Sequence, residues 1–208
     1  LYLHDIEQAR AWLDAGLPLK TMAVNISAIE FGDDRFLDGV FAVLAETGLE
    51  PRALELELTE SVLMKRAVTT QALLKTLRAS GVQLAVDDFG TGYSSLSYLS
   101  KFAIDSLKID QSFVRQISTS PDESSMVSAI ISMARSLKMR VVAEGVETAE
   151  ELAFLQDQKC DEAQGFLFSE PLPPEQFARL LATGIRSAAP GLQAQRHRRL
   201  RETPASTG

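Results

Sequence analysis

Short apolar runs alternate along the chain with longer stretches in which apolar residues recur every three or four positions. The first pattern predicts strands and the second predicts amphipathic helices. In one run, Leu54–Thr59, leucine alternates with polar residues at a period of two, as a strand requires. The predicted strands are Met22–Ser27, Leu54–Thr59, Val82–Val86, Ile104–Asp110, Met139–Ala143 and Cys160–Phe168.

Helices are predicted between these runs, and several have clear start signals. The opening segment, Leu1–Ala15, has its apolar residues at helical spacing. Ser120 with Glu123, and Thr148 with Glu151, have the spacing of capping boxes, in which each side chain satisfies a free backbone N–H group at the helix start. The other predicted helices cover residues 36–44, 73–77 and 174–184, with one or two helical turns over 94–101.

Six strands alternating with helices predict an α/β fold of the TIM-like (β/α) barrel type. A doubly wound open sheet is the main rival, but its Gly-x-Gly-x-x-Gly turn is missing from the sequence. A closed barrel of this type has eight strands, so about six of the eight are expected here. Because the chain opens with Leu1 inside a helix, we expect a fragment that lacks the N-terminal strands.

The predicted barrel domain covers residues 1–184, and residues 185–208 have a different composition. The latter stretch is rich in arginine, alanine, proline, serine and threonine and has almost no apolar periodicity. Such a composition predicts a disordered basic tail. The alternative, a partner-binding role for the basic cluster around Arg198, stays open.

Composition excludes several classes of function. The net charge of −7 argues against DNA or RNA as a partner. One cysteine, Cys160, and two histidines are too few for a zinc site of the usual kind. No apolar run approaches the roughly 20 residues that span a bilayer, so no membrane contact is expected in this segment. The expected compartment is the cytoplasm, for a free domain or for the cytoplasmic part of a larger membrane-anchored protein.

Polar residues stand at the carboxyl ends of the predicted strands, where barrel enzymes carry their active sites. Most of them are carboxylates, which repel one another unless cations neutralise them. Oxygen ligands suit Mg²⁺ or Mn²⁺, and a pair of such ions is suited to cleaving a phosphodiester. The strand-end residues are Asn25, Glu57, Asp87, Asp88, Lys108, Glu144 and Gln164.

Each of these residues also has a plainer interpretation when it is taken alone. Asn25 suits the cap of a turn, and Asp87 and Asp88 suit a turn sequence. The alternation around Glu57 is equally typical of charges that face solvent. Lys108 can be a lysine whose stem lies on apolar surface while its ammonium group reaches water.

Taken together, the motifs resemble those of EAL domains, the cyclic-di-GMP phosphodiesterase family, over roughly residues 1–183. The run from Asp87 to Leu96 is long enough to be specific by itself. The six motifs, in order, are Asn25-Ile26-Ser27, Glu57-Leu58-Thr59-Glu60-Ser61, Asp87-Asp88-Phe89-Gly90-Thr91-Gly92-Tyr93-Ser94-Ser95-Leu96, Leu107-Lys108-Ile109-Asp110, Ala143-Glu144-Gly145-Val146-Glu147 and Gln164-Gly165-Phe166.

The resemblance implies a role for each motif residue in the hydrolysis of cyclic-di-GMP to linear pGpG with two Mg²⁺ or Mn²⁺ ions. Lys108 and Glu144 are implied to be catalytic. Lys108 would position the attacking water or a phosphate oxygen, and Glu144 would act as a base or as a ligand of the second metal. The implied metal ligands are Asn25, Glu57, Asp87 and Asp88. Glu60 and Glu147 are implied to brace the loop 89–98, and Gln164 and Asp110 to belong to the substrate or metal–water network.

The resemblance also implies partners, and one departure leaves the function of this chain open. A homodimer through the 89–98 region and an upstream GGDEF or sensory domain are expected, in bacterial second-messenger signalling that controls biofilm and motility. No Glu-Ala-Leu occurs in the chain, although the family draws a metal ligand from it. An impaired phosphodiesterase is the leading hypothesis. The alternatives are a non-catalytic cyclic-di-GMP receptor and a regulatory dimerisation module.

Overall fold

A computed structural model describes residues 3–64, 67–91, 99–118 and 121–184, and a six-stranded parallel sheet forms its centre. Neighbours along the chain are neighbours in the sheet, in the order β1-β2-β3-β4-β5-β6. A doubly wound sheet reverses its strand order at a switch point, whereas this order never reverses, so the barrel-type prediction is confirmed. The strands are β1 (Met22–Ile26), β2 (Leu54–Thr59), β3 (Gln83–Phe89), β4 (Ser106–Ile109), β5 (Arg140–Ala143) and β6 (Glu162–Ala163).

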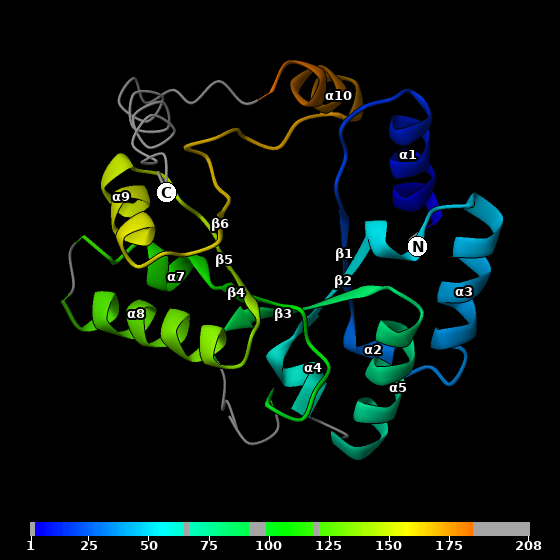
Figure 1. The fold of residues 1–208 in the computed structure, drawn as a ribbon, viewed down its shortest axis with the longest axis horizontal. Coiled ribbons are helices and arrows are strands. Elements are labelled where there is room, and N and C mark those ends of the chain that lie inside the picture. Colours follow the sequence, from blue (N-terminus) through cyan, green and yellow to red (C-terminus); the bar gives the residue numbers. More distant parts are fainter. Residues whose placement is uncertain (1–2, 65–66, 92–98, 119–120, 185–208) are drawn as a thin grey trace, which may run out of the picture.

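The helices surround the strands as an outer ring (Figure 1). The longer ones are α1 (Leu3–Asp14), α3 (Phe36–Thr47), α5 (Ala67–Ala79), α8 (Pro121–Ser136), α9 (Ala149–Asp157) and α10 (Pro174–Thr183). Short helices that the apolar spacing did not predict follow or precede strands: α2 (Ala28–Phe31), η1 (Pro51–Ala53), α4 (Glu60–Met64) and α7 (Gln111–Val114). Within the described ranges, no helix has the length and apolar character needed to cross a membrane.

Helix starts follow the predicted chemistry where they are described. The Thr148 side chain accepts a hydrogen bond from the backbone of Glu151, whose carboxylate returns one to the backbone of Thr148. Ser27 and Glu30 form the same reciprocal cap at α2. Ser120 and most of the predicted segment 94–101 lie outside the described residues, as does the predicted tail.

The main apolar core lies between the sheet and the helices, and the inner face of the sheet is polar. On β2, Leu54, Leu56 and Leu58 are at most 1% exposed. Glu55 and Glu57 point to the opposite face and are also buried, at 8% and 7% exposure. The solvent-facing interpretation of the Glu57 alternation is therefore wrong, because in a barrel the second face of a strand lines the interior.

The last strand is much shorter than predicted. Only Glu162–Ala163 pair with β5, whereas the apolar pattern predicted Cys160–Phe168. After β6 the chain turns at Gly165, whose φ is +154°. Leu167 then donates a backbone hydrogen bond to Val146, and Phe168 donates one to Gly165. The apolar residues of this segment thus pack in a turn, which periodicity alone does not distinguish from a strand.

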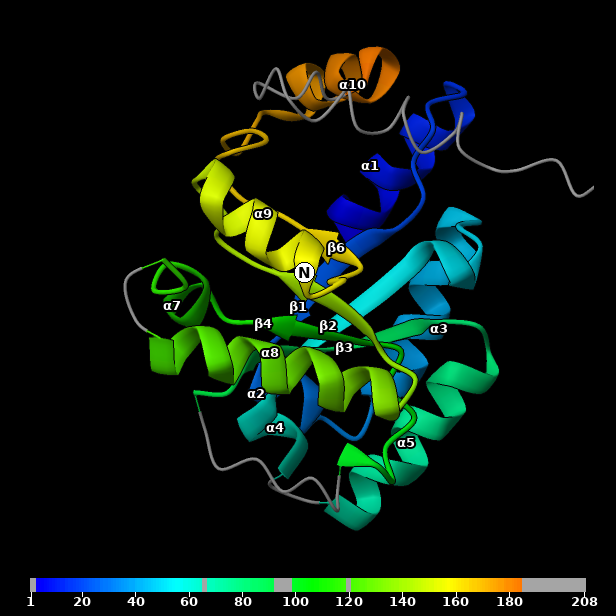
Figure 2. The same cartoon turned by 60° about the vertical axis from the view of Figure 1, so that its left-hand side comes forward.

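Strands β1 and β6 form the two ends of the sheet, and α1 and α10, the first and last of the described helices, lie next to each other. Both ribbon views show α10 next to α1 (Figures 1 and 2). The rings of Trp12 and Phe177 lie 5.1 Å apart, centroid to centroid, at 48°. This contact joins segments that are more than 160 residues apart in the chain.

Candidate active site

Lys108 of β4 lies at the centre of a cluster of carboxylates. Its ammonium nitrogen is 2.7 Å from Glu57 Oε2, 2.7 Å from Glu144 Oε1 and 3.1 Å from Asp87 Oδ1. Lys108 itself is 6% exposed, so the interpretation as a lysine reaching into solvent is wrong. The cluster joins the carboxyl ends of β2, β3, β4 and β5.

A small residue on β3 makes this crossing possible. Strands β2 and β4 are not neighbours, since β3 lies between them. Ala85 of β3 is in register with Glu57 on one side and with Ser106 on the other. Its methyl side chain leaves room above the inner face, so Glu57 and Lys108 can meet across it.

Asp87 and Asp88 reach the same site because the strand is irregular there. Side chains of consecutive residues in a regular strand point to opposite faces. The β3–β4 register shifts between Val86 and Phe89, and Asp88 has a φ of +52°. Oxygen atoms of Asp87, Asp88 and Glu144 consequently lie within 4.8 Å of one another, a group that could hold a metal ion. Backbone strain at a non-glycine residue is common where it orients a functional side chain.

Two glycines, Gly145 and Gly165, allow the loops that carry Glu144 and Gln164 to lie in close contact. Any other residue at either position would force the neighbouring atoms to shift. A Cβ atom on Gly145 would stand 2.5 Å from Gln111 Cβ, and one on Gly165 would stand 2.3 Å from the backbone N and O of Val146. With the two loops in such close contact, Gln164 Nε2 donates a hydrogen bond of 2.8 Å to Glu144 Oε1. The same carboxylate oxygen thus receives Gln164 and Lys108.

Burial and mutual repulsion shift the pKa values in the cluster. Burial raises the pKa of the Glu57 and Glu144 carboxyls, and Lys108 opposes this shift in both. The pKa of Asp88 is raised by burial and by the nearby charges of Asp87 and Asp110. Burial disfavours the Lys108 ammonium, but Glu57 and Glu144 outweigh it and raise the pKa of Lys108 above its ordinary value. Four carboxylates facing one ammonium group leave an excess of negative charge.

The remaining candidate residues are arranged more loosely. Asn25 is in register with Glu57 on the neighbouring strand, and its side chain is exposed. The Asp110 side chain caps α7 by accepting a hydrogen bond of 2.9 Å from the backbone N–H of Ser112.

The two residues expected to brace the loop 89–98 are Glu60 and Glu147. Glu60 begins α4 with its carboxyl buried, and its Oε2 has no hydrogen-bond partner among the described residues. Glu147 pairs with Arg115 at 2.7 Å. Residues 92–98 of the loop assigned to Glu60 and Glu147 lie outside the described residues.

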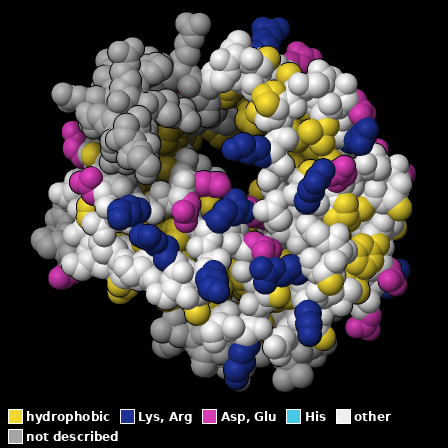
Figure 3. Space-filling view, viewed as in Figure 1, with side chains coloured by type: hydrophobic (Ala, Val, Ile, Leu, Met, Phe, Trp, Pro, Cys, Tyr) yellow, Lys and Arg dark blue, Asp and Glu magenta, His cyan; other side chains and the backbone are white. Residues whose placement is uncertain are grey.

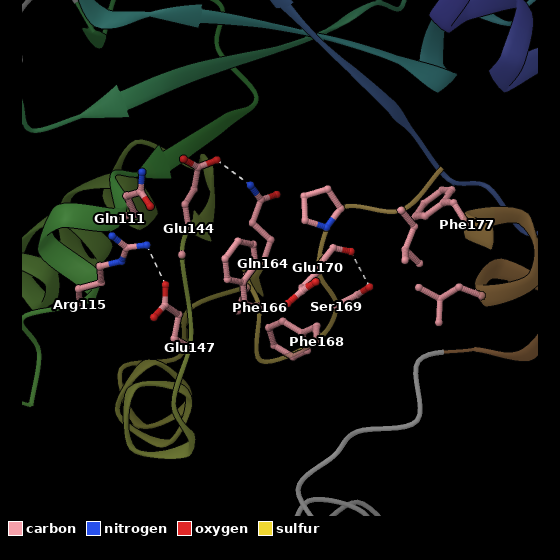
Figure 4. A pocket seen from close by; sticks show the side chains of 16 residues that line it. Gln111, Arg115, Glu144, Glu147, Gln164, Phe166, Phe168, Ser169, Glu170 and Phe177 are labelled. Carbon is pink, nitrogen blue, oxygen red and sulfur yellow. Dashed lines mark hydrogen bonds and ion pairs between the residues drawn. The ribbon is translucent and has the colours of Figure 1, made fainter. Parts of the chain in front are cut away.

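A cavity of about 900 Å³ opens beside Glu144 and Gln164 (Figure 4). Aromatic side chains of Phe166, Phe168 and Phe177 line it, and Phe166 is 60% exposed. Polar side chains of Arg115, Glu147 and Gln164 line the same cavity. Sequence reasoning missed this cavity, although the Phe-Leu-Phe sequence directly after Gln164-Gly165 was a usable signal.

The surface seen in the space-filling view has mixed charge. Lys and Arg side chains lie among Asp and Glu side chains around a central hollow (Figure 3). Among the described residues of this face, the basic side chains thus lie next to acidic ones.

Comparison with known proteins identifies relatives over most of the described chain. The EAL domain family matches residues 3–171. The bifunctional diguanylate cyclase/cyclic di-GMP phosphodiesterase MucR of Pseudomonas aeruginosa is 42% identical over 175 residues, which are 84% of this chain and 26% of MucR. The cyclic di-GMP phosphodiesterase PdeR of Escherichia coli is 42% identical over 84% of this chain and 26% of its own length. The chain thus spans about a quarter of each of these relatives.

Solved structures agree in fold. The MucR phosphodiesterase in complex with c-di-GMP superposes with a TM-score of 0.81 at 42% identity, over 84% of this chain and 71% of that one. The EAL domain of Mycobacterium smegmatis DcpA gives 0.84 at 37% identity, over 88% and 82%. Klebsiella pneumoniae BlrP1, in a manganese/cy-diGMP complex, gives 0.69 at 37% identity, over 82% and 45%.

Proposed function

Because the chain belongs to the EAL domain family, we propose that it is the catalytic part of a phosphodiesterase that hydrolyses cyclic-di-GMP to linear pGpG. The observation that carries this proposal is the cluster around Lys108, with carboxylates from three other strands. Relatives at 42% identity are named cyclic di-GMP phosphodiesterases, which supports the same substrate. The cell compartment we propose is the cytoplasm.

Two divalent cations, Mg²⁺ or Mn²⁺, fit the donor set. All proposed ligands are oxygen atoms, and those of Asp87, Asp88 and Glu144 already lie within 4.8 Å of one another. Asn25, Glu57 and Asp87 would hold the first ion, and Asp87 with Asp88 the second. When bound, such ions acidify a water molecule and neutralise charge that develops on the phosphate.

Lys108 acts in this proposal as a permanently charged hydrogen-bond donor. With its raised pKa it keeps its proton at neutral pH, so it does not serve as a general base. Its three N–H groups contact Glu57, Asp87 and Glu144 in the structure. Any of them that a carboxylate releases on binding a cation can orient the attacking water or a phosphate oxygen. Glu144, whose pKa is raised by burial, is the better proton acceptor. Gln164 orients Glu144 through the hydrogen bond to Oε1.

The cavity beside Glu144 is a suitable place for a base of the dinucleotide. Phe166 and Phe168 offer ring faces for stacking, and the Arg115 guanidinium offers donors for a base or a phosphate. Glu144 lines the same cavity. A base held there would keep the scissile phosphate close to the carboxylate cluster.

A second candidate, a non-catalytic cyclic-di-GMP receptor, concerns the 208 residues taken by themselves. The 208 residues contain no Glu-Ala-Leu, the sequence from which the family draws another ligand of the first ion. We propose that turnover by the polypeptide as it stands is low for this reason, while dinucleotide binding persists. A regulatory dimer through the region 89–98, with a GGDEF or sensory domain upstream, is compatible with either candidate.

The deciding experiment compares this polypeptide with one extended upstream through a Glu-Ala-Leu strand. Formation of pGpG from cyclic-di-GMP is measured by chromatography with Mn²⁺ or Mg²⁺, and dinucleotide binding by calorimetry. We expect turnover by the extended chain, inhibition by Ca²⁺, and loss of activity in EDTA. Binding without turnover by both chains would support the receptor, and full activity in EDTA would exclude the metal mechanism.

A further inference from the structure

A second polar layer lies inside the sheet, one step below the carboxylate cluster. Glu55 Oε2 accepts a hydrogen bond of 2.9 Å from Ser106 Oγ and one of 2.7 Å from Arg140 Nη2. Glu55 is 8% exposed and Ser106 is fully buried. Glu55, Ser106 and Arg140 together form what we call the lower layer.

The lower layer joins the same two strands that the Glu57–Lys108 pair joins. Glu55 precedes Glu57 by two positions on β2, and Ser106 precedes Lys108 by two positions on β4. Residues two apart on a strand share a face. The side chains thus connect β2 to β4 twice, across β3, in two successive layers.

Arg140 extends this connection to the remaining strands. It belongs to β5, where it is in register with Ser106. Besides Glu55, its guanidinium donates to Gln83 of β3 at 3.0 Å and to Glu162 of β6 at 2.9 Å. One side chain of the lower layer therefore contacts groups on β2, β3 and β6.

The two layers differ in charge balance. At the lower layer the Arg140 guanidinium faces two carboxylates, Glu55 at 2.7 Å and Glu162 at 2.9 Å. In the cluster above, four carboxylates face one ammonium group, and like charges at close range repel. Without bound cations this repulsion favours separation of the carboxyl ends of the strands, and the ion pairs of Lys108 oppose it only in part. The lower layer opposes that separation, because it connects the same strands directly beneath the cluster.

We propose that Glu55 is a positioning residue of the metal site: through Ser106 and Arg140 it sets the spacing of β2, β4 and β5, so that Glu57 and its partners are preorganised for a divalent cation. The inference rests on the proposed function only in that the cluster binds such cations. Residues that orient metal ligands typically contribute 10- to 100-fold to metal affinity.

The test measures Mn²⁺ binding by calorimetry in two variants that conserve charge. Glu55→Asp keeps the negative charge but shortens the side chain by one methylene, so it no longer reaches across β3. Ser106→Ala removes one hydroxyl. We expect Glu55→Asp to weaken Mn²⁺ binding about tenfold and Ser106→Ala to weaken it by a smaller factor. Because charge is constant, a loss of affinity reports on position.

Val40→Ala is the control for stability, since Val40 is buried on α3, away from both layers. It should lower the melting temperature and leave Mn²⁺ affinity unchanged. Wild-type affinity in both Glu55→Asp and Ser106→Ala, or equal weakening in Val40→Ala, would overturn the proposal. Failure of the wild-type chain to bind Mn²⁺ would overturn it as well. If the wild-type chain binds Mn²⁺ but the chain extended through Glu-Ala-Leu does not cleave cyclic-di-GMP, the proposed catalysis alone is refuted, because calorimetry still tests Glu55.

Discussion

At the scale of single residues, Lys108 takes its chemical character from its neighbours. An ammonium group this deeply buried is costly to desolvate, and an unpaired one would lose its proton. Three carboxylates within 3.1 Å reverse that outcome and keep it charged. The same contacts hold the carboxylates near one another while no cation is bound.

Replacing Lys108 by methionine should therefore separate catalysis from cation binding. The variant Lys108→Met keeps the length of the stem but removes the donor. We expect turnover in the extended, active chain to fall by about 10² or more, while Mn²⁺ binds at least as tightly because a competing positive charge is gone. Steady-state assays and calorimetry measure the two effects. The matched control is Lys20→Met, an exposed lysine, and weaker Mn²⁺ binding in Lys108→Met would contradict this account.

Cys160 gives a second prediction at this scale, away from the carboxylates. Burial raises the pKa of its thiol to about 11, from 9.0. The folded state therefore favours the protonated thiol, and the contribution to stability is present below pH 9.0 and lost as the pH rises through about 11. Alkylation by iodoacetamide should be slow at pH 8 in the folded protein and fast in urea. Rapid alkylation of the folded protein at pH 8 would show that the thiol is accessible and ionised.

At the scale of elements, the last strand depends on a glycine more than on its apolar residues. Strand β6 ends at Ala163, and Gly165 lets the next segment pass against Val146. Backbone contact this close aligns Gln164 with Glu144. A side chain at position 165 therefore affects both the fold of the segment and the active-site cluster.

The variant Gly165→Ala should destabilise the protein and move Gln164 away from Glu144. An added Cβ would meet backbone atoms at 2.3 Å, which cannot rotate away as a side chain can. We expect a loss of about 3 kcal/mol or more in the free energy of unfolding, measured with urea. Gly39→Ala is the control, because nothing lies within 4 Å of its added Cβ and it sits in α3. This control should be neutral or stabilising by up to about 1 kcal/mol, so equal losses in the two variants would be inconsistent with the packing argument.

At the scale of the whole molecule, α1 and α10 are in contact, and they are the first and the last of the described helices. Trp12 is the only tryptophan of the chain, so its fluorescence reports on this contact. Phe177 also lines the cavity beside the candidate active site. The packing of α1 against α10 is thus linked to the wall of that cavity.

Removing the Phe177 ring should change both stability and tryptophan emission. For Phe177→Ala we expect about 1–3 kcal/mol of lost stability, because a half-buried ring loses less than a fully buried one. Trp12 should become more exposed to water, with emission shifted to longer wavelength. Phe166→Ala serves as the control, since Phe166 is 60% exposed and should leave both readouts unchanged. An unchanged Trp12 spectrum in Phe177→Ala would mean that the ring contact is absent in solution.

The sequence by itself determined the alternation of strands and helices, and hence the barrel-type order of the sheet. Apolar spacing reports which face of an element is buried, and this holds before any tertiary contact forms. The same information placed Leu54–Thr59 correctly as a strand. Capping residues such as Thr148 located a helix start because their hydrogen bonds are local.

Tertiary structure decided what local patterns leave open. Spacing showed that Glu57 alternates with leucine, but only the arrangement of the neighbouring strands and their side chains made its face an interior one. The turn of Asp88 toward Asp87 depends on a register shift between two strands, and the length of β6 depends on the approach of Val146 to Gly165. The lower layer around Glu55 joins residues 51 and 85 positions apart. These hydrogen bonds form only after folding has brought the strands side by side. The residues next to each partner in the sequence therefore do not predict them.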